Sequence, residues 1–264
     1  MASERTEGVL VARDRTRQLH VGKVPVGGGA PVSVQSMCTT KTDDPSSTLS
    51  QIAHLAEEGC EIIRVAVPNA AVLDGFGEIC RLSPLPVVAD IHFDHRLAIE
   101  AARRGAAALR VNPGNIGSFK RVDAVIDAAG EANIPIRIGV NAGSLDHKID
   151  ERQDLTLPEK LVSSSVSFVE HFEGRGFTDI VLSAKAHSVP TTLATYRALS
   201  RELPQVPLHV GVTEAGTLRQ GTVKNCAAVG ILLEEGIGDT MRLSLTADLC
   251  QRSEERRVGK ECRS

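Results

Sequence analysis

Aromatic side chains are scarce in this sequence. Its 264 residues include no tryptophan, one tyrosine and six phenylalanines, so aromatic residues make up 3% of the chain. A core must therefore be built from Val, Ile, Leu and Ala, which parallel strands and the helices that cover them prefer. Hydrophobic residues make up 42% and charged residues 24%, which is typical of a folded domain and argues against disorder.

An excess of one charge is also lacking, and so are long apolar runs. The formal net charge is −3, which favours neither a nucleic-acid-binding protein nor one that binds membrane surfaces. No segment approaches the roughly 18 apolar residues of a membrane span, and the first 20 residues lack the apolar stretch of a signal peptide. We therefore expect a cytoplasmic protein that binds neither nucleic acid nor membrane.

Closely spaced cysteine pairs are missing too. No C-x-x-C pair occurs, which disfavours a zinc or iron–sulfur site made by this chain alone, so we expect no metal ligands in it. The six cysteines are far apart: Cys38, Cys60, Cys80, Cys226, Cys250 and Cys262.

What the sequence does contain is a regular alternation of strand and helix patterns from residue 31 onward. Short β-branched runs are separated by longer helical patterns. Several of the helical patterns end in glycine directly before the next β-branched run. The predicted strands are residues 31–37, 61–68, 86–92, 107–112, 135–141, 179–186, 207–215 and 239–247.

Eight strands that alternate with helices predict parallel pairing and right-handed crossovers, and hence an α/β fold of the (β/α)₈ TIM-barrel type. The chain length suits one such barrel, which takes about 250 residues. An open doubly wound sheet is the alternative, but its G-x-G-x-x-G fingerprint is missing after the first strand. The glycines of 26–31 precede that strand and indicate a turn.

The predicted domain organisation has three parts. Residues 1–20 form an N-terminal extension, and residues 21–251 form the barrel. Residues 252–264 abandon the pattern where an eighth helix should form, so we expect that helix to be incomplete. Back-translation of this segment can produce the start of a common sequencing-adapter oligonucleotide, so we interpret it as a non-native tail.

Polar side chains share one parity in several predicted strands, and in a barrel one parity points inward. Arg110 and Asn112 alternate with aliphatic residues in the fourth strand, as do Arg137 and Asn141 in the fifth. The same analysis adds residues near other C-terminal strand ends, where barrel enzymes keep their active sites. These are Arg64, Asp90, His92, Lys185, Arg242 and Ser244.

Five cations that converge on one end of the barrel cannot all be neutralised by Asp90 and Glu214. An uncompensated buried charge costs several kcal/mol, so an anionic ligand is the simplest compensation. Arginine also supplies the planar fork that suits phosphate oxygens. The loop 139–146 could add backbone N–H groups. Glu214 shares the parity of Val210 and Val212, so it reaches this end only if its strand ends or bulges before it.

Six segments together resemble the barrel domain of the 4-hydroxy-3-methylbut-2-enyl diphosphate synthase family. They occur in the family's order and at compatible spacing over roughly residues 21–250. The segments are VQSM (34–37), VADIHFD (88–94), RVNPGNIG (110–117), IPIRIGVNAGSL (134–145), LHVGVTEAG (208–216) and EGIGDTMRLSL (235–245).

The resemblance implies an oxidoreductase of bacterial isoprenoid biosynthesis by the non-mevalonate pathway. Its reaction is the reductive ring opening and dehydration of 2-C-methyl-D-erythritol 2,4-cyclodiphosphate to 4-hydroxy-3-methylbut-2-enyl diphosphate. By motif, Asp90, His92 and Glu214 would be the catalytic residues that orient the ring and its hydroxyl groups. The diphosphate would be held by Arg64, Arg110, Arg137, Lys185, Arg242 and Ser244, with Asn112 and Asn141 assisting.

The resemblance also implies partners that this sequence does not supply. The family takes electrons from reduced ferredoxin or flavodoxin through a 4Fe-4S cluster, whose ligands lie in a C-terminal domain that closes over the partner barrel of a homodimer. We expect that domain to be absent, so this chain would be the substrate-binding barrel and inactive alone. One alternative is a pterin-binding barrel like dihydropteroate synthase, although 34–44 lacks its Asn-Val-Thr-Pro loop. The other is a non-catalytic anion-binding barrel.

Overall fold

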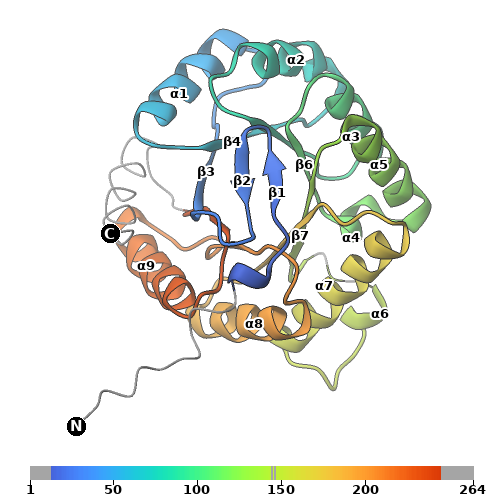
Figure 1. Ribbon diagram of the computed structural model, residues 1–264, viewed down its shortest axis with the longest axis vertical. Coiled ribbons are helices and arrows are strands. Elements are labelled where there is room, and N and C mark those ends of the chain that lie inside the picture. Colours follow the sequence, from blue (N-terminus) through green and yellow to red (C-terminus); the bar gives the residue numbers. More distant parts are fainter. Residues whose placement is uncertain (1–12, 144, 146, 245–264) are drawn as a thin grey trace.

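A ring of parallel strands surrounded by helices makes up the described part of the chain, which is residues 13–143, 145 and 147–244 of a computed structural model (Figure 1). The eight strands run in the order β8-β7-β6-β5-β4-β3-β10-β9, and a single bridge between Leu182 and Leu208 brings β8 beside β9. The strands are β3 (Ser33–Met37), β4 (Ile62–Ala66), β5 (Val87–Asp90), β6 (Ala108–Val111), β7 (Ile136–Asn141), β8 (Ile180–Lys185), β9 (His209–Val210) and β10 (Thr240–Met241).

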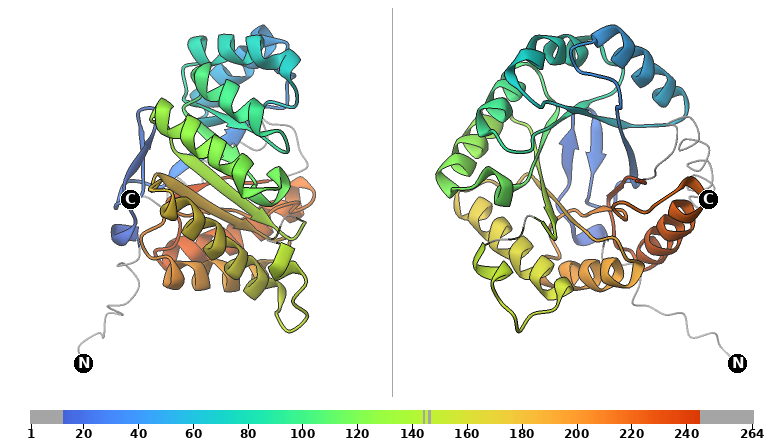
Figure 2. Two further views of the ribbon diagram at one scale, coloured as in Figure 1. Left: turned by 90° about the vertical axis from the view of Figure 1, so that its right-hand side faces the viewer. Right: turned by 180° about the vertical axis from the view of Figure 1, so that it is seen from behind.

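The predicted (β/α)₈ TIM barrel is therefore confirmed, and the open sheet is wrong. At least one helix follows each barrel strand from β3 to β9, and the helices cover the outside of the ring (Figure 2). They are α1 (Pro45–Glu57), α2 (Leu73–Leu82), α3 (His95–Arg103), α4 (Pro113–Ile116), α5 (Phe119–Ala132), α6 (His147–Asp150), α7 (Leu157–Gly174), α8 (Val189–Glu202) and α9 (Leu218–Glu234), with 3-10 turns at η1 (Arg13–Arg15) and η2 (Ala70–Val72).

Helix ends follow the signals in the sequence. Asp44 caps α1 by accepting a hydrogen bond from the Ser47 backbone N–H at 3.0 Å. Gly59 and Gly236 follow α1 and α9 with φ of 87° and 70°, a left-handed conformation that ends a helix at little cost in glycine. The predicted eighth helix and the tail 252–264 lie outside the described residues.

A hairpin closes the N-terminal end of the barrel, and the sequence did not predict it. β1 (Leu19–Val21) pairs antiparallel with β2 (Val24–Val26), and the hairpin lies across the centre of the ring in Figure 1. Its Leu19, Val21 and Val26 pack against Ile62 and Val88 at the beginnings of barrel strands. Part of the predicted extension 1–20 is thus the start of an apolar plug.

Two strands are shorter than predicted. The segment 207–215 pairs only at His209 and Val210, because Gly211 (φ 151°) and Glu214 (φ 47°) take conformations that a regular strand does not use. In the eighth segment only Thr240 and Met241 pair. The residues after each of these short strands are therefore available to form loops at the C-terminal end of the barrel.

Among the described residues, no helix combines the length and the apolar character needed to cross a membrane.

Candidate functional site

A cavity of about 190 Å³ lies at the C-terminal end of the barrel, opposite the hairpin. Residues of all eight barrel strands, or of the segments that follow them, line it, so most of the polar positions of one parity converge as predicted. Its lining residues are Met37, Arg64, Asp90, His92, Arg110, Arg137, Gly139, Val140, Asn141, Ser183, Lys185, Thr213 and Arg242.

Asp90 is the carboxylate of this lining, and cations surround it. Its Oδ1 lies 3.2 Å from Arg110 Nη1, and its Oδ2 lies 3.4 Å from Arg64 Nε and 3.3 Å from His92 Nε2. Burial alone would raise the pKa of Asp90, but Arg64, the hydrogen bond with His92 and Arg110 together hold it well below its usual value. Asp90 is therefore ionised at neutral pH and can only accept hydrogen bonds there.

Lys185 lies deep in the same cavity. Its Nζ is buried and has no hydrogen-bond partner among the described residues. Burial first, and then the charges of Arg242, Arg137 and Arg64, lower the pKa of Lys185 well below its usual value. This amine faces like charges without a carboxylate of its own, which is unfavourable unless a ligand supplies the negative charge.

Two glycines make room for these long side chains. A Cβ at position 139 would lie 3.0 Å from Arg110 Nε, which is too close for ordinary packing. A Cβ at position 211 would lie 3.3 Å from Lys185 Nζ and 2.3 Å from the Arg242 carbonyl oxygen. A side chain at either position would therefore force the neighbouring Arg110 or Lys185 side chain to shift.

The remaining two arginines have neutral neighbours. Arg137 Nη1 donates to Gln35 Oε1, and both side chains are buried. Arg242 Nη2 donates to Ser244 Oγ at 3.3 Å, and its Nη1 lies 3.6 Å from Met37 Sδ. Burial, then the charges of Arg64 and Arg110, lower the pKa of Arg137 well below its usual value. The site therefore keeps a surplus of positive charge.

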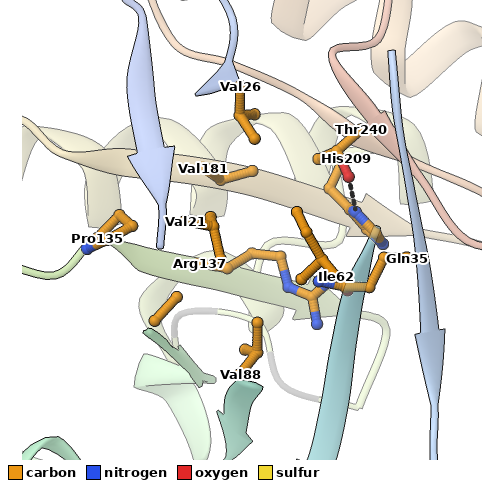
Figure 3. A pocket seen from close by; sticks show the side chains of 11 residues that line it. Val21, Val26, Gln35, Ile62, Val88, Pro135, Arg137, Val181, His209 and Thr240 are labelled. Atoms are coloured by element: carbon orange, nitrogen blue, oxygen red, sulfur yellow. Dashed lines mark hydrogen bonds between the residues drawn. The ribbon is translucent and has the colours of Figure 1, made fainter. Parts of the chain in front are cut away.

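A second, smaller cavity of about 20 Å³ lies below Arg137, between the barrel strands and the hairpin (Figure 3). Val21 and Val26 of the hairpin line it together with Arg137, Gln35 and other residues. Also on its lining is His209, whose Nδ1 lies 3.4 Å from Thr240 Oγ1. Arg137 lines both cavities and so separates the polar end of the barrel from the apolar plug.

The structure brings together most of the residues that the sequence singled out, but not all. Glu214 does not line the cavity: its side chain is 79% exposed, and its Oε2 lies 3.3 Å from His187 Nδ1. Asn112 is buried and is not part of the lining either, and its side-chain atoms have no hydrogen-bond partner among the described residues. Ser244 reaches the site through Arg242, and Asn141 accepts from the Gly143 backbone N–H at 3.1 Å.

Four residues of this lining escaped the sequence analysis: Met37, Val140, Ser183 and Thr213. Gln35, which lines the smaller cavity, escaped it as well. Strand parity could have found Gln35 and Met37, because they alternate with Val34 and Ser36 in the first barrel strand. Thr213 lines the cavity where Glu214 was expected, since the chain has already left the ladder there. No simple pattern marks Ser183.

The arrangement suits an anion with more than one negative charge. Arg64, Arg110, Arg137, Arg242 and Lys185 face one cavity, whereas Asp90 is the only carboxylate that lines it in the described part of the chain. Guanidinium groups bind phosphate oxygens through paired N–H donors, and burial strengthens such contacts because competing water is scarce.

Comparison with known families decides where the chain belongs. The family described as the GcpE TIM-barrel domain matches residues 16–260, which is most of the chain. This chain is a member of that family. The family domain covers the barrel and the whole cavity, so the match includes the strands that carry the cations.

Curated relatives agree with this assignment. A "4-hydroxy-3-methylbut-2-en-1-yl diphosphate synthase (flavodoxin)" from Geobacter sulfurreducens is 51% identical over 234 residues, which are 89% of this chain and 66% of the relative. A protein of the same name from Pseudomonas syringae is 50% identical over 90% of this chain and 64% of the relative. The chain thus spans slightly less than two thirds of the length of these relatives.

Solved structures of other enzymes share the fold of this family member at low sequence identity. A dihydropteroate synthase from Xanthomonas albilineans superposes with a TM-score of 0.58 at 13% identity, over 94% of this chain and 99% of that one. A phospho-2-dehydro-3-deoxyheptonate aldolase from Thermotoga maritima gives 0.62 at 14% identity, over 94% and 73%. Likenesses of this kind support the TIM-barrel architecture and no particular chemistry.

The described residues do not fit a 4Fe-4S cluster. No three His, Cys, Asp or Glu side chains among them gather where they could hold a metal ion. No disulfide joins the four described cysteines to one another, and burial raises the pKa of Cys38 and of Cys80 to about 12, which favours the thiol over the metal-binding thiolate. The described residues therefore offer no ligand set for such a cluster.

Proposed function

We propose that this chain is the substrate-binding barrel of a 4-hydroxy-3-methylbut-2-enyl diphosphate synthase. The substrate would be 2-C-methyl-D-erythritol 2,4-cyclodiphosphate, which the complete enzyme opens by reduction and dehydration in isoprenoid biosynthesis. The single observation that carries the proposal is the cavity in which five cations face one carboxylate. A cyclic diphosphate brings two negative charges on linked phosphoryl groups, which is the complement that this surplus requires.

In this proposal the basic residues and the acidic residue of the cavity bind different parts of the substrate. Arg64, Arg110, Arg137, Lys185 and Arg242 bind the phosphoryl oxygens, and Ser244 orients Arg242. Asp90, which is ionised, accepts a hydrogen bond from a hydroxyl group of the substrate, and His92 can donate or accept beside it.

Three further residues take secondary roles. Asn141 lines the cavity and assists with the diphosphate, and Asn112 supports the site from outside the lining. Glu214 stands with His187 beyond the lining, so it could act on the substrate only after its loop moves inward. The family resemblance assigns Glu214 a catalytic role in this proposal.

Electron supply belongs to the same proposal. Reductive dehydration needs a redox centre, because amino-acid side chains do not deliver single electrons at a low potential. We propose that a 4Fe-4S cluster is held by ligands outside the described residues, in a further domain that closes over the partner barrel of a homodimer. The names of the relatives favour flavodoxin over ferredoxin as the donor.

The alternatives have less support. A pterin-binding barrel shares the fold, but relatives at about 50% identity have a different activity in their names. A cavity lined by five basic side chains also suits an anion better than a neutral flat heterocycle. A non-catalytic anion-binding barrel would share the cavity but would not distinguish the cyclodiphosphate from other anions.

Titration calorimetry of the 264-residue chain tests the proposal. We expect the cyclodiphosphate to bind with one site per chain and more tightly than inorganic pyrophosphate, while a pterin produces no heat. Equal affinity for the two phosphates would favour the non-catalytic alternative, and the absence of cyclodiphosphate binding would refute the proposed function.

A further inference from the structure

The strand β3 places neutral hydrogen-bond acceptors among the cations of the site. Gln35 and Met37 share the inward parity of this strand. Gln35 Oε1 accepts from Arg137 Nη1, while Met37 Sδ accepts from Arg64 Nη2. No charged residue occurs in β3, so the acceptors on this side of the barrel hold guanidinium groups without cancelling their charge.

The contact between Gln35 and Arg137 spans the inside of the barrel. Arg137 comes from β7, and three strands (β4, β5 and β6) separate it from β3 in the ring. In Figure 3 the Arg137 side chain extends from its strand toward Gln35. Both residues are nearly inaccessible to water, with 6% and 4% of their surfaces exposed, so solvent cannot replace the bond if Gln35 is lost.

The position of this contact matters because Arg137 lies between two environments. Above it is the cationic cavity, and below it is the small cavity that the valines of the hairpin line. The Arg137 side chain is long enough to point toward either cavity. The bond to Gln35 fixes its direction before a ligand arrives, which removes an entropic cost from binding.

An amide suits this task better than a carboxylate would. A glutamate in place of Gln35 would bind Arg137 more strongly, but it would also neutralise the charge that attracts an anion. Asp90 already contacts Arg64 and Arg110 in this way. The Gln35 carbonyl uses one of the five N–H donors of Arg137 and leaves its net charge intact.

We propose that Gln35 is a positioning residue of the anion site, which orients Arg137 and leaves its positive charge for the ligand. The identity of the ligand as a cyclodiphosphate rests on the proposed function, whereas the role of Gln35 requires only that the cavity binds phosphoryl groups.

Three variants of the 264-residue chain test this inference. Gln35→Glu should raise the melting temperature of the ligand-free protein, because it compensates a surplus charge, and should weaken cyclodiphosphate binding by about tenfold or more. Gln35→Met, which keeps the size but removes the acceptor, should lower both the melting temperature and the affinity. Gln153→Glu is the matched control, since Gln153 is exposed and the same change there should leave both quantities within error.

The opposite response of stability and affinity in Gln35→Glu distinguishes positioning from a purely structural role, which would move both in the same direction. Unchanged affinity in Gln35→Glu, or a ligand-free Gln35→Glu protein that melts at a lower temperature than the wild type, would overturn the inference.

Binding of inorganic pyrophosphate separates this inference from the proposed function. Wild-type protein that binds pyrophosphate but not cyclodiphosphate refutes the proposed function, and the same criteria applied to pyrophosphate then decide the role of Gln35. Wild-type protein that binds neither overturns both.

Discussion

Asp90 determines how three neighbouring side chains are held. It is 1% exposed and contacts Arg64, Arg110 and His92, so its charge is the internal compensation for the cations of the cavity. Asp90→Asn keeps the shape but removes the charge. We expect it to lower the free energy of unfolding by about 3–5 kcal/mol, as for other buried ion pairs that lose one partner. Urea denaturation measures this.

The pH dependence of stability should change with the same variant. Because the pKa of Asp90 is lowered in the folded protein, its stabilising effect is complete above the usual aspartate value of about 4 and is lost as the pH falls below it. The wild type should therefore lose stability below about pH 4 more steeply than Asp90→Asn. Asp43→Asn is the control and should follow the wild type, because Asp43 is exposed at the surface.

Arg110 gives a direct test of ligand binding at the residue scale. Arg110→Ala should weaken cyclodiphosphate binding by about 1–3 kcal/mol, which is the cost of losing a charge-assisted pair. Arg110→Lys should recover part of the loss, because it restores the charge but not the planar fork. Arg96→Ala removes an arginine whose side chain is 78% exposed, so it should have no effect. Equal affinities for the wild type and Arg110→Ala in calorimetry would remove this residue from the site.

The environment of Lys185 predicts that the protein takes up a proton when it binds an anion. Burial and the surrounding charges of Arg242, Arg137, Arg64 and Arg110 lower its pKa, so the free protein holds it as a neutral amine at pH values where the unfolded chain is protonated. A bound anion favours the ammonium form. Affinity should therefore fall as the pH rises above the lowered pKa, and binding above it should take up one proton.

Calorimetry in two buffers of different ionisation enthalpy measures this uptake. The ligand-free protein should meanwhile gain stability as the pH rises from the lowered pKa toward the usual lysine value of about 10, because the unfolded state binds the extra proton in that range. Lys185→Met should abolish the proton uptake, whereas Lys224→Met, on the exposed face of α9, should preserve it. Binding without any change in protonation would contradict the placement of a neutral amine in this cavity.

Single residues were predictable where strand parity alone fixes their direction. Arg64, Asp90, Arg110, Arg137 and Lys185 point inward because they lie within regular strands, whose alternation sets the direction of a side chain. Glu214 was not predictable, because its left-handed φ of 47° lies beyond the end of β9, where parity no longer applies. Asn112 begins the short helix α4, so its side chain follows loop geometry as well.

Among the elements, the hairpin gives the clearest prediction. Leu19 is buried against the beginnings of the barrel strands, so Leu19→Ala should lower the free energy of unfolding by about 2–5 kcal/mol. Cyclodiphosphate affinity should stay unchanged, because the hairpin and the cationic cavity lie at opposite ends. Leu82→Ala, at a half-exposed position in α2, should change neither quantity by much. Chemical denaturation and calorimetry on the same samples provide both values.

The elements differ in how far the sequence reveals them. The barrel strands and their helices carry long periodic patterns, so their order and type were predictable. β1 and β2 have three residues each, and β2 contains Pro25, so neither carries a pattern of its own. They form because the open end of the barrel offers Ile62, Val88, Ala108 and Val181 as an apolar surface. This is a tertiary effect that no local window contains.

At the scale of the whole molecule, binding and electron transfer should separate. Reconstituted with iron and sulfide, the 264-residue chain should bind cyclodiphosphate but show no stoichiometric cluster absorbance and no product with reduced flavodoxin. A fusion that replaces residues 252–264 with the part of the Geobacter relative beyond the matched region should restore both. Turnover by the unmodified chain would show that the cluster ligands are within it after all.

The apolar plug also determines the route by which a small molecule enters and leaves the barrel. Because Val21 and Val26 seal one end, a ligand arrives and departs through the same opening at the other end. Arrival and departure therefore cannot proceed at once, and one molecule must leave before the next can take its place. A protein domain that covers the opening would slow the association and the dissociation of the ligand alike. The residence time of the ligand would then depend on that cover as well as on the contacts inside the cavity.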